Sequence, residues 1–286
     1  MGQGHRLTAL GLIETAGRST LRNLSVFLVL SILYLLLLYP FLRPMAPELN
    51  LAADETMSRL MDGLGDLPRI LLALLVNILV FTLFVLVWSR CILAGAKGIF
   101  LGGAGKFFSR WLWVVVRYFD LITYVLIIPV PLAVAAGFAI GLYVAPDGRA
   151  VAIAALYPFL MLLFAVIMMI FLVSAIAAST DDRLSMRDAW KLCEGERVRL
   201  LISMALLYAA GFGLTYALAS ILFPAGAAAG ILSLMLPSAL SGRDAISYFA
   251  LNFPPLLVFG LVVAILAESY QRLTGSISRQ QAEETF

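Results

Sequence analysis

The chain has 286 residues, of which 62% are hydrophobic and only 13% are charged, and its mean hydropathy is +1.00. A soluble domain of this length needs far more polar surface, so the composition predicts a chain whose solvent is mostly lipid. A net charge of +3 is too small to indicate a nucleic-acid partner. We therefore expect an all-α, polytopic membrane protein, organised as a single transmembrane domain over residues 1–286.

Six segments are long and apolar enough to cross a bilayer as helices, for which about 20 apolar residues are needed. The fourth is long for a bilayer, so it should tilt, kink at Pro158 or emerge from the membrane. In the sixth, we expect Pro254 and Pro255 to break the helix. The predicted spans cover approximately residues 24–42, 70–94, 118–143, 150–178, 200–223 and 245–266, as three helical hairpins.

Lysine and arginine are distributed unevenly between the connections. Fifteen of the 20, counting Arg90 near the end of the second span, precede the first span, lie in the second and fourth connections, or follow the last span. Because positively charged segments resist translocation, this side is predicted to be cytoplasmic. Both termini then lie in the cytoplasm, and the acid-bearing loop from Arg43 to Arg69 lies outside.

The stretch Thr180 to Leu200, TDDRLSMRDAWKLCEGERVRL, is rich in charge, but its apolar residues recur at helical spacing. Ser185 followed by Asp188 resembles a capping box, and Gly195 is a natural helix end. We expect an amphipathic interfacial helix over residues 185–194; the alternative is an extension of the fourth span that packs on its neighbours. Its apolar face is formed by Met186, Ala189, Trp190 and Cys193, with Arg187 and Lys191 on the charged face.

A weaker interfacial helix is predicted over residues 100–112, because its glycines disfavour a helix. Trp111 lies on its apolar side, and Lys106 and Arg110 lie off that side. The apolar spacing of residues 57–64 predicts a further surface helix on the opposite leaflet. Because basic, amphipathic segments precede each outward-going span, the three hairpins are either related repeats or share only their positive flanks.

Two asparagines lie within predicted spans, where an unpaired amide is costly. Asn77 lies near the middle of the second span, and Asn252 precedes the two prolines of the sixth. A hydrogen bond to another helix is the default interpretation of each. Lining of a substrate path is the alternative, because a helix broken beside Asn252 would free backbone carbonyls, as in transporters.

Other spacings predict contacts within the bundle. Two oppositely charged pairs stand three or four positions apart near predicted span ends, where helical neighbours pair. Small residues at intervals of four in the third span allow another backbone to approach closely, within the bundle or between protomers. These groups are Arg117 with Asp120, Glu268 with Arg272, and Ala133 with Gly137 and Gly141.

Candidates for chemistry are scarce. The sole histidine, His5, lies near the N-terminus, which excludes a histidine-based metal centre or a Ser/His/Asp triad within the chain. The glycines around Lys106 lack the spacing and the following Ser or Thr of a phosphate-binding loop. Cys91 and Cys193 fall on the predicted cytoplasmic side, where thiols stay reduced. We expect no catalytic residue, no metal, no cofactor and no structural disulfide.

At SMRDAWKLCEGERVRLLISMALLY the chain resembles an uncharacterised bacterial inner-membrane family related to the multipass region of membrane-bound glycerophosphodiester phosphodiesterases. The hydrolase domain of those enzymes has no room here, so their catalytic residues do not transfer. The resemblance implies a helical module of a bacterial inner membrane without a known reaction. It is carried by Ser185, Asp188, Ala189, Trp190, Leu192, Gly195 and Arg199, and more weakly by GKFFSRWLWVVVRYFDLITYVL.

The sequence therefore predicts a non-enzymatic integral protein of the inner membrane, in envelope or lipid-related organisation or as a partner subunit. Its expected partners are membrane lipids and either another membrane protein or a second copy of the chain. The alternative is a small transporter or permease subunit with a pathway near Asn77 and Asn252. An intramembrane enzyme ranks third, for want of acid, base and metal ligands.

Overall fold

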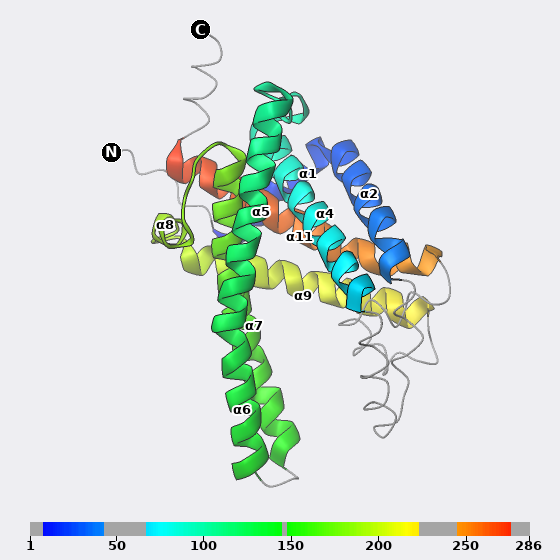
Figure 1. Ribbon diagram of the computed structural model, residues 1–286, viewed down its shortest axis with the longest axis vertical. Coiled ribbons are helices and arrows are strands. Elements are labelled where there is room, and N and C mark those ends of the chain that lie inside the picture. Colours follow the sequence, from blue (N-terminus) through cyan, green and yellow to red (C-terminus); the bar gives the residue numbers. More distant parts are fainter. Residues whose placement is uncertain (1–7, 43–66, 145–147, 223–244, 276–286) are drawn as a thin grey trace.

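The computed structural model describes residues 8–42, 67–144, 148–222 and 245–275, and the secondary structure there is helical, as expected (Figure 1). The surface helix predicted over residues 57–64 lies outside the described residues. The elements are α1 (Ala9–Arg22), α2 (Leu24–Leu42), α4 (Leu67–Ala94), η3 (Ala96–Gly98), α5 (Gly103–Ile127), α6 (Pro129–Tyr143), α7 (Arg149–Ser179), α8 (Met186–Leu192), α9 (Arg197–Leu222) and α11 (Ala245–Thr274).

Five helical segments of the described chain, counting α5 with α6, are long and apolar enough to cross a membrane. The bent pair of α1 and α2 brings the number to six if it is one span. Many large apolar side chains on these helices are exposed, as expected for surfaces that face lipid. The chain is thus a polytopic α-helical membrane protein.

Helix α1 was not among the predicted elements. Thr8 is its N-cap, since the Thr8 hydroxyl accepts a hydrogen bond from Gly11 N at 3.2 Å. At its other end, next to Asn23, the chain bends by 83° into α2. Leu12, Ala16 and Thr20 recur at intervals of four and are buried, while α1 contacts α11 and α9. The N-terminal segment therefore covers the ends of two long helices.

The predicted interfacial helix over residues 100–112 is not a separate element. After the turn at Gly102 and Gly103, which adopt positive φ, α5 runs without a break to Ile127. No proline interrupts it before Pro129, so the amphipathic segment and the apolar segment share one rod. With α6, this rod has 41 residues and a length of about 60 Å, twice the thickness of a hydrocarbon core.

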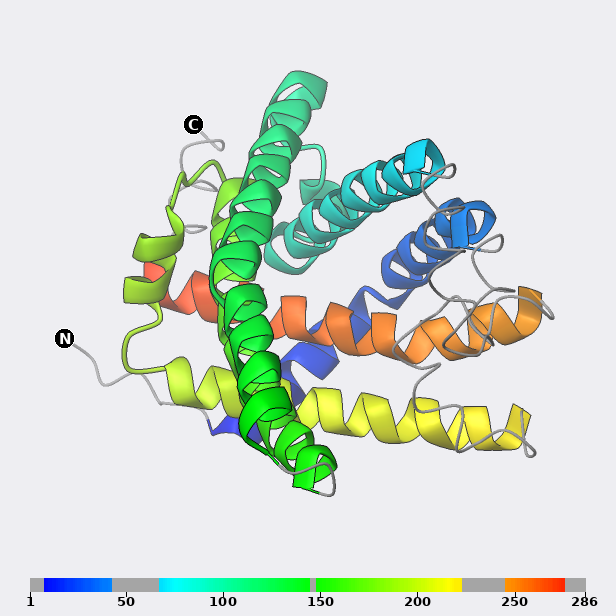
Figure 2. The same ribbon diagram turned by 60° about the horizontal axis from the view of Figure 1, so that its bottom comes forward.

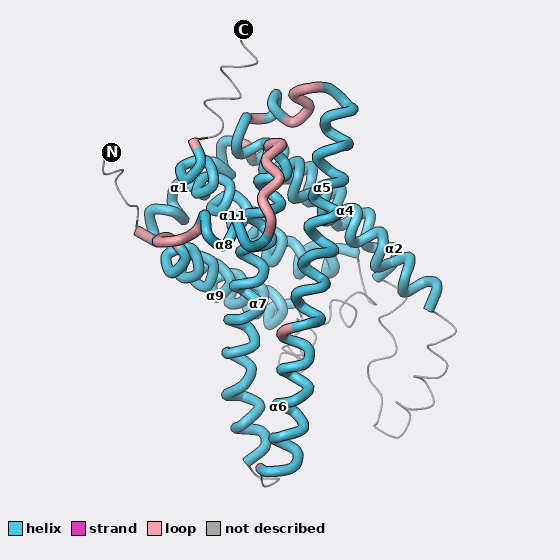
Figure 3. The backbone as a smooth tube through the Cα atoms, turned by 60° about the vertical axis from the view of Figure 1, so that its left-hand side comes forward, coloured by secondary structure: helices cyan, strands magenta, loops and turns pink. Residues whose placement is uncertain are grey.

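The α6 helix and the adjoining half of α7 project from the rest of the bundle (Figures 1 and 3). The helix α6 contacts α7 and α5, and none of its residues is buried. The rod changes from α5 to α6 at Ile128, where Pro129 and Pro131 lack the N–H groups that a continuous helix would use. This projecting pair is apolar on all sides and differs in this respect from the charged first half of α5.

The prediction that Pro254 and Pro255 break the last span is wrong. Helix α11 runs from Ala245 through both prolines to Thr274. Transmembrane helices tolerate proline because neighbouring groups and small backbone adjustments satisfy the freed carbonyls. The helix also continues eight residues beyond the predicted end at residue 266, because α1 covers its polar last turns.

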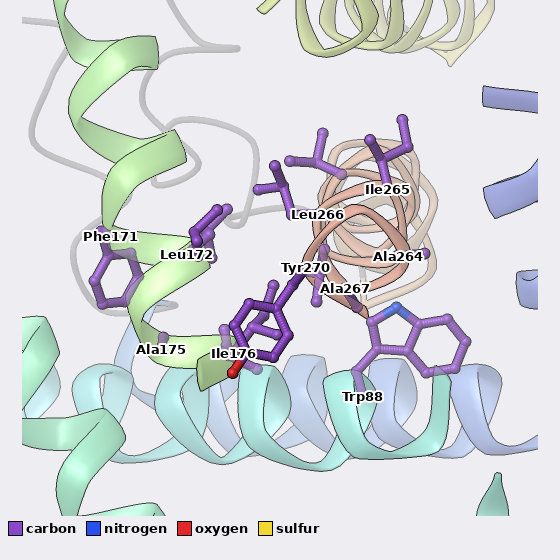
Figure 4. Packing of buried hydrophobic residues seen from close by; sticks show 14 of the residues in the cluster. Trp88, Phe171, Leu172, Ala175, Ile176, Ala264, Ile265, Leu266, Ala267 and Tyr270 are labelled. Atoms are coloured by element: carbon purple, nitrogen blue, oxygen red, sulfur yellow. The ribbon is translucent and has the colours of Figure 1, made fainter. Parts of the chain in front are cut away.

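Helix α11 forms the centre of the core and contacts α1, α2, α4, α7 and α9 (Figure 2). In Figure 4, Tyr270 extends from α11 toward Ile176 of α7, and Trp88 of α4 lies beside α11. The indole N–H of Trp88 donates to the carbonyl of Gly260 at 2.8 Å, inside the core. The ring of Phe27 lies at the centre of an aromatic cluster near this point. Its centroid is 5.1–6.3 Å from those of Phe84, Trp88 and Phe253.

Close helix packing occurs at two glycines that the sequence analysis did not select. A methyl group on Gly211 would lie 2.3 Å from Val258, and one on Gly260 would lie 2.3 Å from Phe27. In contrast, a methyl group on Gly137 or Gly141 would meet no atom of the described chain within 4 Å. The predicted packing seam of Ala133, Gly137 and Gly141 is therefore not used for a close approach within the described chain.

Candidate functional site: a polar clasp at the helix ends

Arg90, near the end of α4, is buried and joins the α4–α5 turn to the end of α7. Its Nε donates to the carbonyls of Gly98 and Ile99 at 3.0 and 3.1 Å, and Nη2 donates to Gly98 at 2.7 Å. Its Nη1 donates to the carbonyl of Ser179 at 2.7 Å. The last carbonyls of a helix lack partners within that helix, so Arg90 satisfies one at the end of α7. In the sequence, Arg90 is recognisable only as one of the basic residues on the predicted cytoplasmic side.

Arg110 of α5 makes a second link to the same helix end. Its Nε lies 3.0 Å from Asp181 Oδ1 and its Nη2 lies 2.6 Å from Asp181 Oδ2, which is a bidentate ion pair. Its Nη1 also donates to the carbonyl of Leu101. The Arg110 side chain is only 3% exposed, because it points into this cluster. Arg110 is therefore a buried, paired side chain, and its position at the membrane interface stays a prediction.

Asp181 also terminates α7. Its φ is +68°, the left-handed conformation that commonly ends helices and that Asp and Asn adopt more readily than most residues. The N–H of Asp182 donates to the carbonyl of Ala177 at 3.0 Å, and that of Asp181 donates to Ala178 at 3.4 Å, which is the Schellman pattern. One residue thus both stops the helix and anchors Arg110.

The next residue, Asp182, links α7 to the core helix α11. Its carboxylate accepts a hydrogen bond from the hydroxyl of Tyr270, whose side chain is buried. The hydroxyl of Thr180 lies 3.4 Å from the same tyrosine oxygen. The polar clasp, defined as Arg90, Arg110, Asp181, Asp182 and Tyr270, therefore joins α4, α5, α7 and α11.

The predicted helix over residues 185–194 is present as α8 (Met186–Leu192). Ser185 caps it, since its hydroxyl accepts from Asp188 N at 3.2 Å and donates to the Asp188 carboxylate at 2.6 Å. That side-chain hydrogen bond lowers the pKa of the exposed Asp188 carboxyl below its usual value. The helix ends earlier than predicted, at Leu192 with Cys193 as its C-cap, and Gly195, with a φ of +85°, lies in the turn that leads to α9. The predicted start at Ser185 is confirmed, and the predicted stop at Gly195 is wrong by a few residues.

The apolar face of α8 contacts protein rather than lipid. Met186, Ala189 and Cys193 are 6%, 0% and 0% exposed and belong to the hydrophobic core. The remaining member, Trp190, is partly buried under the guanidinium of Arg197, which lies 3.8 Å from its ring centroid and donates to its carbonyl. Burial raises the pKa of the Cys193 thiol to about 11. Seating of this face in lipid, which the interfacial assignment implied, is therefore wrong, and the alternative of packing on the neighbouring helices holds.

The remaining predicted interface residues take different positions. Trp111 is partly buried, and its indole N–H donates to the Thr82 hydroxyl at 3.1 Å, which links α5 to α4. Lys106 on α5 is exposed, as are Arg187 and Lys191 on the outer face of α8. The structure separates these residues and brings only Arg110 into the clasp.

The polar residues expected within the spans have partners. The hydroxyl of Tyr34 on α2 donates to Asn77 Oδ1 at 3.1 Å, so Asn77 makes an interhelical hydrogen bond. Asn252 is partly buried in the continuous helix α11. Arg117 and Asp120 form the predicted ion pair, with an Nη1–Oδ2 distance of 2.8 Å.

The second predicted ion pair is looser. Arg272 Nη2 lies 3.8 Å from Glu268 Oε2, while the other carboxylate oxygen of Glu268 accepts a hydrogen bond from the hydroxyl of Ser19 on α1. Glu268 therefore also holds α1 against α11.

Among the described residues, no group of three or more His, Cys, Asp or Glu side chains is arranged to hold a metal ion. Cys91 and Cys193 are both free and buried. The charged side chains of the clasp bind other parts of the same chain, at the ends of four helices. These features define a polytopic membrane protein with a polar clasp. Comparisons with protein families, curated proteins and solved structures each found no match, so the resemblance described above stays a prediction.

Proposed function

We propose that this chain is a non-enzymatic integral protein of a bacterial inner membrane, with a role in envelope or lipid-related organisation or as a partner subunit. The polar clasp is the observation that carries the proposal. Its arginines, carboxylates and tyrosine bind helix ends and one another, so the chemistry-bearing groups of this region are used in holding the bundle together. The bacterial inner membrane is supported by the family resemblance.

The proposed orientation places the clasp at the cytoplasmic side. Helix α8 and the C-terminal end of α11 lie on the same side of the bundle (Figures 1 and 2). Arg183, Arg187 and Lys191, which lie beside or on α8, belong to the connections that carry most of the basic residues, and the positive-inside rule would place these connections in the cytoplasm. Both termini would then be cytoplasmic.

The transport alternative relied on two features. One was an interrupted sixth span beside Asn252, but α11 is continuous there. The other was lining of a substrate path by Asn77, but its amide oxygen accepts an interhelical hydrogen bond from Tyr34. Neither feature now favours a pathway over a packed bundle.

The proposal is tested by extracting the protein from membranes with its surrounding lipid, without detergent, and identifying what remains bound. An organising or partner role predicts enrichment of a particular lipid class or a stoichiometric membrane protein over the bulk membrane. A composition equal to that of the bulk membrane, with no retained protein, would contradict it. A topology reporter after Gly195, an exposed turn residue, should be cytoplasmic, and one after Gly63 should be external.

A further inference from the structure

An arginine without a carboxylate partner rests on a tryptophan beside the clasp. Arg183 follows the end of α7, is exposed, and has its Cζ 4.6 Å from the centroid of the Trp113 ring on α5. No hydrogen bond or ion pair engages the Arg183 guanidinium within the part of the chain that the structure describes. Its five N–H donors are therefore available to a ligand.

The neighbouring cations are neutralised, and Arg183 is not. Arg117 also lies near Trp113, at 6.0 Å from the ring centroid, but Asp120 pairs with it at 2.8 Å. Arg110, one turn before Trp113, is held by Asp181. The adjacent carboxylate of Asp182 is bonded to the Tyr270 hydroxyl and not to Arg183. In the patch formed by Trp113, Arg117 and Arg183, the guanidinium of Arg183 is therefore the group that can bind an anion.

The patch lies where charged surface meets apolar surface. On α5, Leu112, Val116 and Phe119 are exposed beside it, and exposed apolar side chains of this size on a membrane protein face lipid tails. Tryptophan is enriched at the level of the headgroups, and long arginine side chains extend toward the same level. A ligand at this patch would have an anionic part near Arg183 and an apolar part along α5.

We propose that Arg183 and Trp113 bind the phosphate of an anionic phospholipid, whose acyl chains lie along the exposed face of α5. A guanidinium binds phosphate through parallel N–H donors, and stacking on an aromatic ring orients it in advance. A headgroup with its own cation neutralises the phosphate internally and brings positive charge toward Arg117 and Arg183. The patch therefore favours phosphatidylglycerol over phosphatidylcholine. In the proposed orientation, this lipid belongs to the cytoplasmic leaflet, and only this assignment rests on the proposed function.

The test is lipid competition on the full-length protein. The purified protein is equilibrated with equal amounts of phosphatidylglycerol and phosphatidylcholine in mild detergent, and the retained lipids are counted by native mass spectrometry. We expect preferential retention of phosphatidylglycerol by the wild type, and a loss of about tenfold in this preference for Arg183→Gln, the scale of one charge-assisted hydrogen bond. Arg187→Gln is the matched control, because Arg187 is also exposed and lies four positions away on α8.

Three outcomes would overturn the proposal. The first is an unchanged lipid preference in Arg183→Gln, and the second is an equal loss in Arg187→Gln, which would indicate a general charge effect. The third is displacement of phosphatidylglycerol by an equal concentration of inorganic phosphate, which would assign the patch to a soluble anion. Circular dichroism and thermal unfolding show that the variants are folded. Because the assay uses purified protein, a failure of the proposed cellular role or topology leaves its result interpretable.

Discussion

Replacing Gly260 by alanine should destabilise the bundle, because this glycine lets α11 approach α2. The new methyl group would lie 2.3 Å from Phe27 Cε2 and 3.1 and 3.2 Å from two further ring atoms, so Phe27 must move by about 1 Å to restore an ordinary contact. Phe27 is fully buried against three other rings and has little room to move. Overpacking of this kind costs about 1–3 kcal/mol.

The substitution also disturbs a hydrogen bond. The carbonyl of Gly260 accepts from the Trp88 indole at 2.8 Å, and a shift of α11 that relieves the clash lengthens this bond. A buried hydrogen bond contributes about 1 kcal/mol. We therefore expect Gly260→Ala to lower the free energy of unfolding by about 2–4 kcal/mol.

The assay is reversible unfolding in mixed micelles by titration with sodium dodecyl sulfate, followed by tryptophan fluorescence and circular dichroism. Gly137→Ala is the matched control, since its methyl group meets nothing within 4 Å, and alanine should favour the helix by about 0.5–1 kcal/mol. The two substitutions thus have opposite expected signs. Equal stability of Gly260→Ala and the wild type, or destabilisation by Gly137→Ala to the same extent, would refute the packing explanation.

Three further predictions concern the clasp, the elbow and the α2–α4 contact. In the same titration, Asp181→Gly should lower the free energy of unfolding by about 2 kcal/mol, because Arg110 loses its carboxylate partner. Asp181→Ala should lower it by about 1 kcal/mol more, because alanine is also strained at the positive φ of this position. An equal effect of the two substitutions would contradict the double role of Asp181. In a Cys91→Ala variant, Cys193 should resist maleimide at pH 7.5 until the protein unfolds, since burial raises its pKa to about 11; rapid labelling of the folded protein would refute its burial. Because this folded pKa exceeds the usual thiol pKa of 9.0, the contribution of Cys193 to stability is present below about pH 9 and is lost as the pH rises through about 11. Tyr34→Phe should lower the free energy of unfolding by about 0.6 kcal/mol, the mean for interhelical hydrogen bonds in membranes. If Asn77→Ala destabilised the protein and Tyr34→Phe did not, Asn77 would have a role other than this hydrogen bond.

Local signals predicted several elements closely. The bounds of α2 coincide with the predicted span over residues 24–42, since a continuous apolar run must be helical in lipid. Helix α8 was found from its apolar spacing and from its N-cap at Ser185, although it ends at Leu192, before the predicted stop at Gly195. The segment before the first span was predicted to be basic and amphipathic but not helical, although the spacing of Leu12, Ala16 and Thr20 indicates the helix α1.

Other features depend on partners that are distant in sequence. Arg90 and Arg110 resemble any basic residues near span ends, and only the folded chain brings them to the end of α7. The same applies to the glycines. Gly137 and Gly141 have the spacing of a packing seam, yet an added methyl group at either would meet no atom of the described residues within 4 Å. At Gly211 and Gly260, an added methyl group would clash with Val258 and Phe27.

By itself, the sequence determined that the protein is a helical membrane protein and where most of its spans lie, because hydrocarbon demands long apolar helices irrespective of their neighbours. It also determined the N-cap of α8, which depends on residues within one turn. Only the tertiary structure decided that the apolar face of α8 contacts protein, that α5 continues as one rod into its apolar half, and which charges are paired. Amphipathic spacing states that a face is apolar, but lipid and protein both satisfy such a face, and the choice depends on which helices the fold places beside it.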